Sequence, residues 1–357
     1  MTCSVCSPRG ALRALCALAF ALPAAAQEAE RHWLILPAIG SAPETGAQFG
    51  AVVMRVTRPA GAKRPSVNQA YVLATAKHQY QGSIEHDGWS PDARLHHYAK
   101  LDLLDYPLPF YGIGKDAPES NEEWFTSKAV QVQARLQRQI AGAWYAMALA
   151  RVVHTAIEDV EPGRVIASGT LRGATGGTLV QPGAGIAFDT RDDVLAAESG
   201  RYLEASFAVA DKAIGSDFNS TRTMVDARAF RRAGAGILAA QFFADMNAGS
   251  PSFDQMSLVG SDGVLRGYAK GRYRDRALVA AQLEWRAPIW GPWRYAVFGG
   301  LGAIGNTPAK LGALTLPTYG AGLRFRVFKT ERSAIRLDYA MGRTGSSGLY
   351  ISLDEAY

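Results

Sequence analysis

A permanently charged side chain stands inside a turn-rich stretch of the C-terminal half of the chain. Residues 257–268 read Ser-Leu-Val-Gly-Ser-Asp-Gly-Val-Leu-Arg-Gly-Tyr. The small residues in the middle of this stretch predict a loop rather than a strand. Arg266 keeps its charge at every physiological pH, so it needs water or a carboxylate as a partner. Gly267 lets the backbone take a positive φ or pass close to a wall, directly before Tyr268. A solvated arginine on a surface turn is the simpler interpretation of these residues alone.

Carboxylates on two later segments are candidate partners for this arginine. Glu284 and Asp338 stand at alternating positions that place them on the polar faces of their segments, and Arg286 shares the face of Glu284. A charge in a partly dry interior is costly unless it is paired. We therefore predict that Arg266 pairs with Asp338 or with Glu284. A wall of solvated charges of both signs, without a specific pair, is the alternative.

A second cluster of charges reads Asp189-Thr190-Arg191-Asp192-Asp193. Several carboxylates close together can bind calcium. Aspartate side chains also accept hydrogen bonds from the backbone of turns. We favour the second interpretation, in which Asp189, Arg191 and Asp192 organise a turn, and we predict no metal site.

Enzyme chemistry finds little support in the sequence. His96 and His97 stand near Asp102 and Asp105, which would suit a hydrolase or a metal site. Adjacent residues of a strand face opposite sides, so the two histidines cannot join one set of ligands. The chain has no Gly-x-Ser-x-Gly elbow, His-Glu-x-x-His motif or phosphate-binding glycine loop. We predict neither catalytic residues nor a cofactor, and an outer-membrane hydrolase is the least favoured alternative.

The first 26 residues predict a secretory signal peptide. Arg9 and Arg13 precede a short apolar run, and three alanines form a cleavage site before Gln27. All three cysteines lie in this segment, so the predicted mature chain cannot form disulfides or thiolate metal sites. The formal net charge of +6 is too small to indicate nucleic acid as a partner. No apolar run of about 18 residues follows, so the exported chain is either soluble or an outer-membrane β-barrel.

Alternation with a period of two decides between these classes. Residues 129–139, 277–286, 319–327 and 333–342 alternate between apolar and polar side chains. The polar positions carry glycine, glutamine and charges of both signs, which is typical of a barrel with lipid outside and a polar lumen inside. We predict one all-β domain, residues 27–357, folded as a transmembrane antiparallel barrel of sixteen strands. The predicted strands are 31–37, 46–58, 67–77, 79–88, 94–106, 124–137, 142–155, 178–191, 200–212, 220–231, 234–247, 273–288, 292–304, 318–328, 333–343 and 348–357.

The lengths of the connections predict which end faces outward. With both termini in the periplasm, the long connections 107–123, 156–177 and 248–272 follow odd-numbered strands and face the exterior, whereas the turns after even-numbered strands are short. Aromatic residues near strand ends predict girdles at the membrane interfaces. They are Trp285, Trp290, Trp293, Tyr295 and Tyr357.

Several blocks of this chain, taken in order, resemble the BamA/TamA family of outer-membrane barrels, also called the bacterial surface antigen family. Arg266-Gly267-Tyr268 resembles the family loop that folds back into the barrel lumen. The other blocks are Pro43–Gly46, Phe110–Gly114, Asp189–Asp192, Glu284–Arg286, Gly320–Arg324 and Arg336–Tyr339. The resemblance implies that the connection 248–272 plugs the lumen.

The resemblance also implies a function. Members of this family insert outer-membrane proteins or move polypeptide or lipid across the outer membrane, and the seam between the first and last strands is their working element. The implied partners are outer-membrane lipid, lipopolysaccharide and unfolded outer-membrane or secreted polypeptides. Only residues 27–30 separate the predicted cleavage site from the first strand, so we expect a member without POTRA domains. A passive pore or a structural barrel is the alternative.

Overall fold

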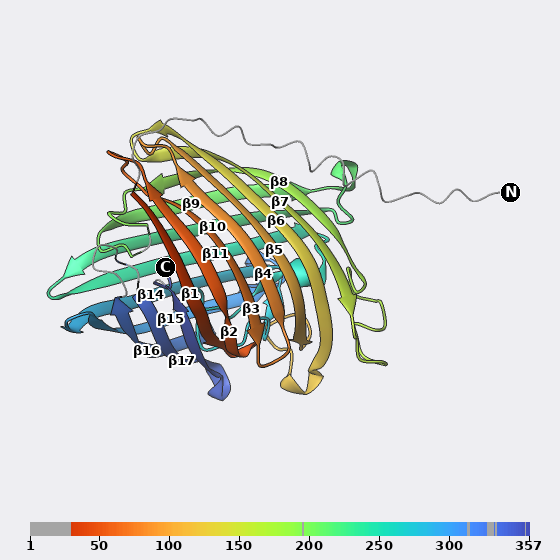
Figure 1. Ribbon diagram of the computed structural model, residues 1–357. Coiled ribbons are helices and arrows are strands. Elements are labelled where there is room, and N and C mark those ends of the chain that lie inside the picture. The colour runs from red at the N-terminus through yellow and green to blue at the C-terminus, as the bar shows by residue number, and fades with distance from the viewer. Residues whose placement is uncertain (1–29, 195, 313–314, 327–331, 333, 354) are drawn as a thin grey trace.

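Sixteen strands close into one antiparallel barrel in the computed structural model (Figure 1). The structure describes residues 30–194, 196–312, 315–326, 332, 334–353 and 355–357, so the predicted signal peptide lies outside the described residues. Within the described ranges, no helix is long and apolar enough to cross a membrane. The wall strands are β1 (Glu30–Ala42), β2 (Gly46–Arg58), β3 (Ser66–Thr75), β4 (Tyr80–Trp89), β5 (Leu95–Phe110), β6 (Glu123–Ala141), β7 (Trp144–Glu158), β8 (Gly176–Asp189), β9 (Gly200–Ala210), β10 (Ser220–Ala233), β11 (Gly236–Gly249), β14 (Ala277–Trp290), β15 (Trp293–Gly305), β16 (Leu316–Arg326), β17 (Ala334–Met341) and β18 (Ser347–Leu353).

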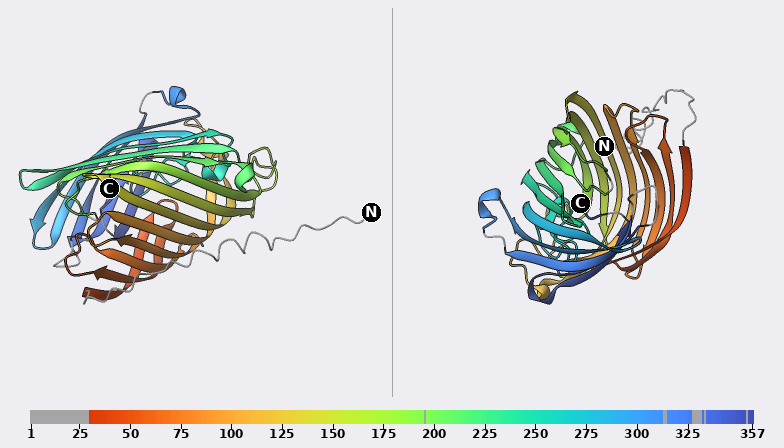
Figure 2. Two further views of the ribbon diagram at one scale, coloured as in Figure 1. Left: turned by 90° about the horizontal axis from the view of Figure 1, so that it is seen from above. Right: turned by 90° about the vertical axis from the view of Figure 1, so that its left-hand side faces the viewer.

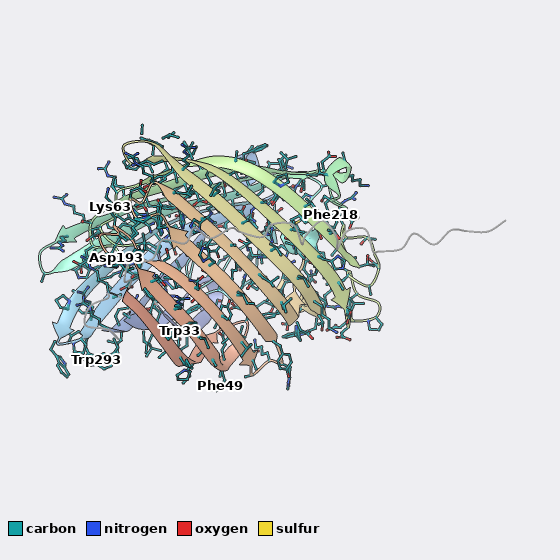
Figure 3. The ribbon with its side chains drawn as sticks, turned by 45° about the horizontal axis from the view of Figure 1, so that its top comes forward. Trp33, Phe49, Lys63, Asp193, Phe218 and Trp293 are labelled. Atoms are coloured by element: carbon teal, nitrogen blue, oxygen red, sulfur yellow. The ribbon has the colours of Figure 1, made fainter. Side chains whose placement is uncertain are left out.

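Alternation along these strands separates an apolar outer face from a polar inner face. In β14 the side chain of Leu283 is 56% exposed, whereas Gln282 and Glu284 on either side are 5% and 0% exposed. Trp33 and Phe49 are among the exposed apolar side chains on the outside of the wall (Figure 3). Apolar positions outside and polar positions inside are the arrangement of a barrel that stands in lipid. The predicted fold class and strand number are confirmed.

The two ends of the barrel differ in the lengths of their connections. The long connections 111–122, 159–175 and 250–276 follow β5, β7 and β11 and share one end, which we call the loop end. Short connections join the strands at the opposite end, which we call the turn end. Phe218 lies at the loop end and Lys63 at the turn end (Figure 3).

Several details of the predicted elements are wrong. The stretch from Ser257 is not wholly a loop, because β12 (Ser257–Leu258) pairs with β13 (Arg274–Asp275) in a small separate sheet. The wall strand predicted from residue 273 therefore begins only at Ala277. The first strand continues to Ala42, well beyond its predicted end, because it aligns with the whole of β2.

The last strand is also shorter than predicted. β18 ends at Leu353, and Tyr357 does not join an aromatic girdle. Its side chain is 6% exposed and packs on the inner face with Ala197, Phe230 and Ala239. The end of the described chain therefore turns into the barrel instead of continuing along the wall.

The barrel closes where β1 meets β18, and few residue pairs are aligned across this seam. β1 and β2 align thirteen residue pairs, and β17 and β18 align seven. Across the seam, the described residues align in one pair, Ser41 with Ile351. Figure 2 views the wall from two further sides and shows the first strands in red and the last strands in blue.

Candidate functional site

The connection between β11 and β14, residues 250–276, turns back against the inner faces of β14 to β18. The backbone N–H of Leu265 donates to the side chain of Gln282 over 2.8 Å. Leu265 and Tyr268 are fully buried in an apolar cluster with side chains of β14, β15 and β16. Glycine provides the space, because a Cβ at Gly302 would stand 2.3 Å from Leu265. This connection therefore lies on the lumen side of the wall.

Arg266 stands at the centre of this contact. Its side chain is 1% exposed, and its two terminal nitrogens reach two carboxylates: Nη2 donates to Glu284 on β14 and Nη1 donates to Asp338 on β17. Both carboxylates are 0% exposed. The guanidinium carbon lies 3.5 Å from the centre of the Phe298 ring, and cations over aromatic rings are attracted to them. The structure thus brings Arg266 to both candidate partners.

Further arginines complete the charge balance around these two carboxylates. Arg324 donates to Asp338 over 2.5 Å and lies 3.2 Å from Glu284. Arg286 donates to Glu284 over 2.7 Å. Glu355, from the segment after β18, lies 2.8 Å from Arg324 and 3.4 Å from Arg286. Loss of one member would leave the others buried without full compensation, which is costly.

A fourth arginine extends the network toward the loop. Arg336 on β17 is 1% exposed and lies 3.0 Å from the carboxylate of Asp262 in the 250–276 connection. It also donates to Ser352 on β18. Ion pairs therefore join this connection to β14 and β17, and they extend to Arg324 on β16 and to Glu355 after β18. We call these residues the lumen charge network: Asp262, Arg266, Glu284, Arg286, Arg324, Arg336, Asp338 and Glu355.

Gly267 and Tyr268 join the 250–276 connection to β16 and β18 through hydrogen bonds. Gly267 has φ +107°, and a Cβ there would stand 2.6 Å from the backbone of Met341, so only glycine fits. Its N–H donates to the hydroxyl of Tyr350 on β18 over 2.8 Å. The hydroxyl of Tyr268 donates to the carbonyl of Pro317 over 2.7 Å and accepts from the N–H of Arg343.

Phe298, Tyr350 and Glu355 are members of this site that the sequence did not predict. Phe298 stands in a segment without an acid, and its importance is the ring beneath Arg266. The sequence gives no signal for Phe298, because its place opposite Gly320, where a Cβ would stand 2.5 Å from the ring, depends on the register of two strands. Tyr350 gives none because it contacts a distant connection, and Glu355 gives none because its role depends on how the chain turns inward after β18.

The Asp189 cluster organises the β8–β9 connection. Asp189 accepts two hydrogen bonds from the guanidinium of Arg191 and one from Arg64. Asp192 accepts from the backbone N–H groups of Glu198 and Ser199. Burial raises the pKa of Asp192, but the hydrogen bond from Arg332 and these backbone donors outweigh it and hold the pKa below its usual value. These contacts are those of a turn-forming cluster.

The two adjacent histidines face opposite sides of the wall. His96 points inward and contacts Gln137 and Asp87, whereas the ring of His97 stacks on His86 at 4.9 Å on the outer face. Over the described part of the chain, no three histidine, cysteine or acidic side chains are grouped so that they could hold a metal ion.

Comparison with known proteins places this barrel in a family. Residues 84–348 match the model of the Omp85 superfamily domain. The chain belongs to the Omp85 superfamily, which agrees with the resemblance in the sequence. This membership supports a location in the outer membrane. No curated protein matches the chain by sequence.

Solved structures show the same fold at low sequence identity. BamA from Haemophilus ducreyi lacking POTRA domains 1–3 superposes with a TM-score of 0.60 at 12% identity, over 91% of this chain and 70% of that one. CdiB from Acinetobacter baumannii gives 0.55 at 10% identity, over 92% and 66%. CdiB from Escherichia coli gives 0.59 at 10% identity, over 90% and 63%. The chain thus spans about two thirds of the length of these proteins.

Proposed function

We propose that this protein admits polypeptides to the outer membrane, or passes them across it, by opening the barrel between β1 and β18. The observation that carries the proposal is the seam, in which Ser41 and Ile351 are the single aligned pair of described residues. Family membership and the barrel fold support handling of polypeptides in general. The proposed role is not catalytic, and the apolar outer face contacts lipid and lipopolysaccharide.

The thin seam lowers the free energy needed for opening. A backbone hydrogen bond contributes a net of about 0.5–1.5 kcal/mol in water, and neighbouring strands of this barrel share many more of them. An open strand edge within lipid is unfavourable, because its N–H and C=O groups have no partners. The exposed edge of β1 would therefore accept a strand from another polypeptide, and main-chain hydrogen bonds would supply the affinity.

The lumen contacts decide which side of the seam moves. The 250–276 connection binds β14 and β17 through Arg266 and binds β18 through Tyr350. Among the described residues, it makes one hydrogen bond to the β1–β2 hairpin, in which the backbone N–H of Lys270 donates to Glu44 in the turn. We infer that β14 to β18 and this connection form a fixed unit and that β1 and β2 move away from it.

Depletion of the protein in cells that produce it tests the proposal. If it handles polypeptides, depletion should lower the amounts of folded outer-membrane or secreted proteins, and the wild-type gene should restore them. The same cells should be tested for uptake of small hydrophilic solutes. A change in uptake with unchanged protein levels would favour the alternative, a passive pore or structural barrel.

A further inference from the structure

The β8–β9 connection, residues 190–199 with residue 195 outside the described part, crosses the turn end of the barrel. Asp189, at the end of β8, lies 2.9 Å from Arg64 in the β2–β3 turn, five strands away around the wall. In the opposite direction, Asp192 lies 2.7 Å from Arg332, in the connection after β16 and also five strands away. We call residues 189–194 and 196–199 the strap.

The strap is also held in its middle. Glu198 lies 2.7 Å from Arg232 at the end of β10 and 3.4 Å from Arg294 on β15. Ala197 is 5% exposed and packs against Phe230, beside Tyr357. Gly200 closes the strap with φ +104°, where a Cβ would stand 2.2 Å from the carbonyl oxygen of Thr190.

In each salt bridge that joins the strap to the rest of the described chain, the strap supplies the carboxylate and an arginine at the turn end supplies the cation. These arginines, which we call the arginine rim, are Arg64, Arg232, Arg294 and Arg332. Within the described part of the chain, Arg232 and Arg294 form salt bridges with Glu198, and Arg332 forms one with Asp192. If the strap moved aside, these three arginines would lose those salt bridges.

We propose that the arginine rim is a binding surface for acidic polypeptide segments and that the strap occupies it until such a segment displaces the strap. This inference rests on the proposed function, because it names the chemistry of the polypeptide that enters. Direct competition for the same guanidinium groups is the physical mechanism. Arginine suits this role, because its planar donors match carboxylates.

The position of the rim favours polypeptide over lipid as the source of the carboxylates. Arg294 alternates with Tyr295 and Val297, which are 38% and 46% exposed on the outer face, so Arg294 points to the lumen side. A cavity of about 400 Å³ beside the strap, on the side of Arg64, has a mostly polar lining that includes Lys63, Asp189 and Asp193. Lys63 and Asp193 lie at the same end of the barrel (Figure 3). A lipid would have to leave the apolar outer face to reach these groups.

Binding of a fluorescent ten-residue polyglutamate peptide to the purified full chain in detergent micelles tests this proposal. The variant Asp192→Asn/Glu198→Gln weakens the strap and should bind this peptide about tenfold more tightly than the wild type, because removing partly exposed ion pairs raises the fraction with a free rim. Adding Arg232→Gln and Arg294→Gln to that variant should abolish the gain. A ten-residue polylysine peptide should gain no affinity from any of these changes.

Two controls keep the result interpretable. Glu158→Gln removes a half-exposed carboxylate from an ion pair with Lys128 on the outer face near the loop end, and it should leave polyglutamate binding unchanged. Glu198→Gln alone is a milder variant and should give a smaller gain if the double variant does not fold.

Unchanged polyglutamate affinity in both strap variants, or an equal gain for polylysine, would overturn the proposal. Competition by micelles doped with anionic lipid would assign the rim to lipid instead. None of these outcomes depends on opening of the seam. A failure of this proposal would therefore not be a failure of the proposed function, which is tested by other experiments.

Discussion

Arg266 joins the 250–276 connection to two buried carboxylates of the barrel wall. Each of its two terminal nitrogens meets a different buried carboxylate. Arg266→Ala should destabilise this region by about 3–5 kcal/mol, because it leaves buried charge uncompensated. Arg266→Lys should recover little of the loss, because one ammonium group cannot bridge Glu284 and Asp338 in the same planar geometry. Cleavage by protease within residues 250–276 of the folded protein measures the effect.

Double substitutions determine which carboxylate is coupled to Arg266. Asp338→Ala and Glu284→Ala should each loosen the connection, and each should be less than additive with Arg266→Ala because the same contacts are lost. Arg94→Ala is the control, since Arg94 and its partner Asp92 are largely exposed and such pairs contribute little. Additive effects for both carboxylates would instead support a wall of solvated charges.

At the scale of an element, the 250–276 connection is the segment that we expect to close the lumen. We expect it to obstruct the lumen, because it lies against the inner faces of β14 to β18. Replacing residues 252–273 by a short glycine-serine linker should convert a small, flickering conductance in planar bilayers into a larger, steady one, since a sixteen-stranded barrel is wide enough for an aqueous channel. Deleting residues 212–216 from the loop after β9 should leave the conductance unchanged. An unchanged conductance after the first replacement would show that the connection does not obstruct the lumen.

The strands could be predicted from the sequence because each one has one face toward lipid and one face toward the lumen. A period of two, with apolar side chains at one set of positions and polar side chains at the other, follows directly from a wall with lipid on one side. The pair formed by β12 and β13 left no such pattern, because two residues per strand are too few to alternate. The inward turn of Tyr357 was missed for a related reason, since an aromatic residue suits both a girdle and a buried cluster.

The candidate site was less predictable than the wall. Alternation placed Glu284 and Asp338 on the inner face, but it could not show how Arg266 reaches them from a distant connection. The contact of Arg266 with Phe298 depends on the register between β15 and β16, where Phe298 stands opposite Gly320. The contacts of the strap with Arg64 and Arg332 likewise depend on closure of the barrel. No local sequence pattern predicts that closure.

At the scale of the whole molecule, the outer face predicts where the protein resides and how it behaves in detergent. The folded barrel should fractionate with the outer membrane and migrate faster than the heat-denatured chain on gels, because a closed wall of hydrogen-bonded strands resists detergent until it is heated. Recovery of the protein from the soluble periplasmic fraction would contradict this expectation.

Covalent closure of the seam tests the central claim most directly. Ser41 and Ile351 are aligned partners, and opposed residues in antiparallel strands have Cα atoms about 4.5–5.5 Å apart, within the range of a disulfide. The variant Ser41→Cys/Ile351→Cys therefore locks β1 to β18 when it is oxidised. The variant Tyr339→Cys/Leu349→Cys places the same bond between β17 and β18 as a control.

In depleted cells, the oxidised seam variant should fail to restore outer-membrane or secreted proteins, whereas its reduced form and the oxidised control should restore them. Full restoration by the oxidised seam variant would contradict a function that requires the barrel to open there.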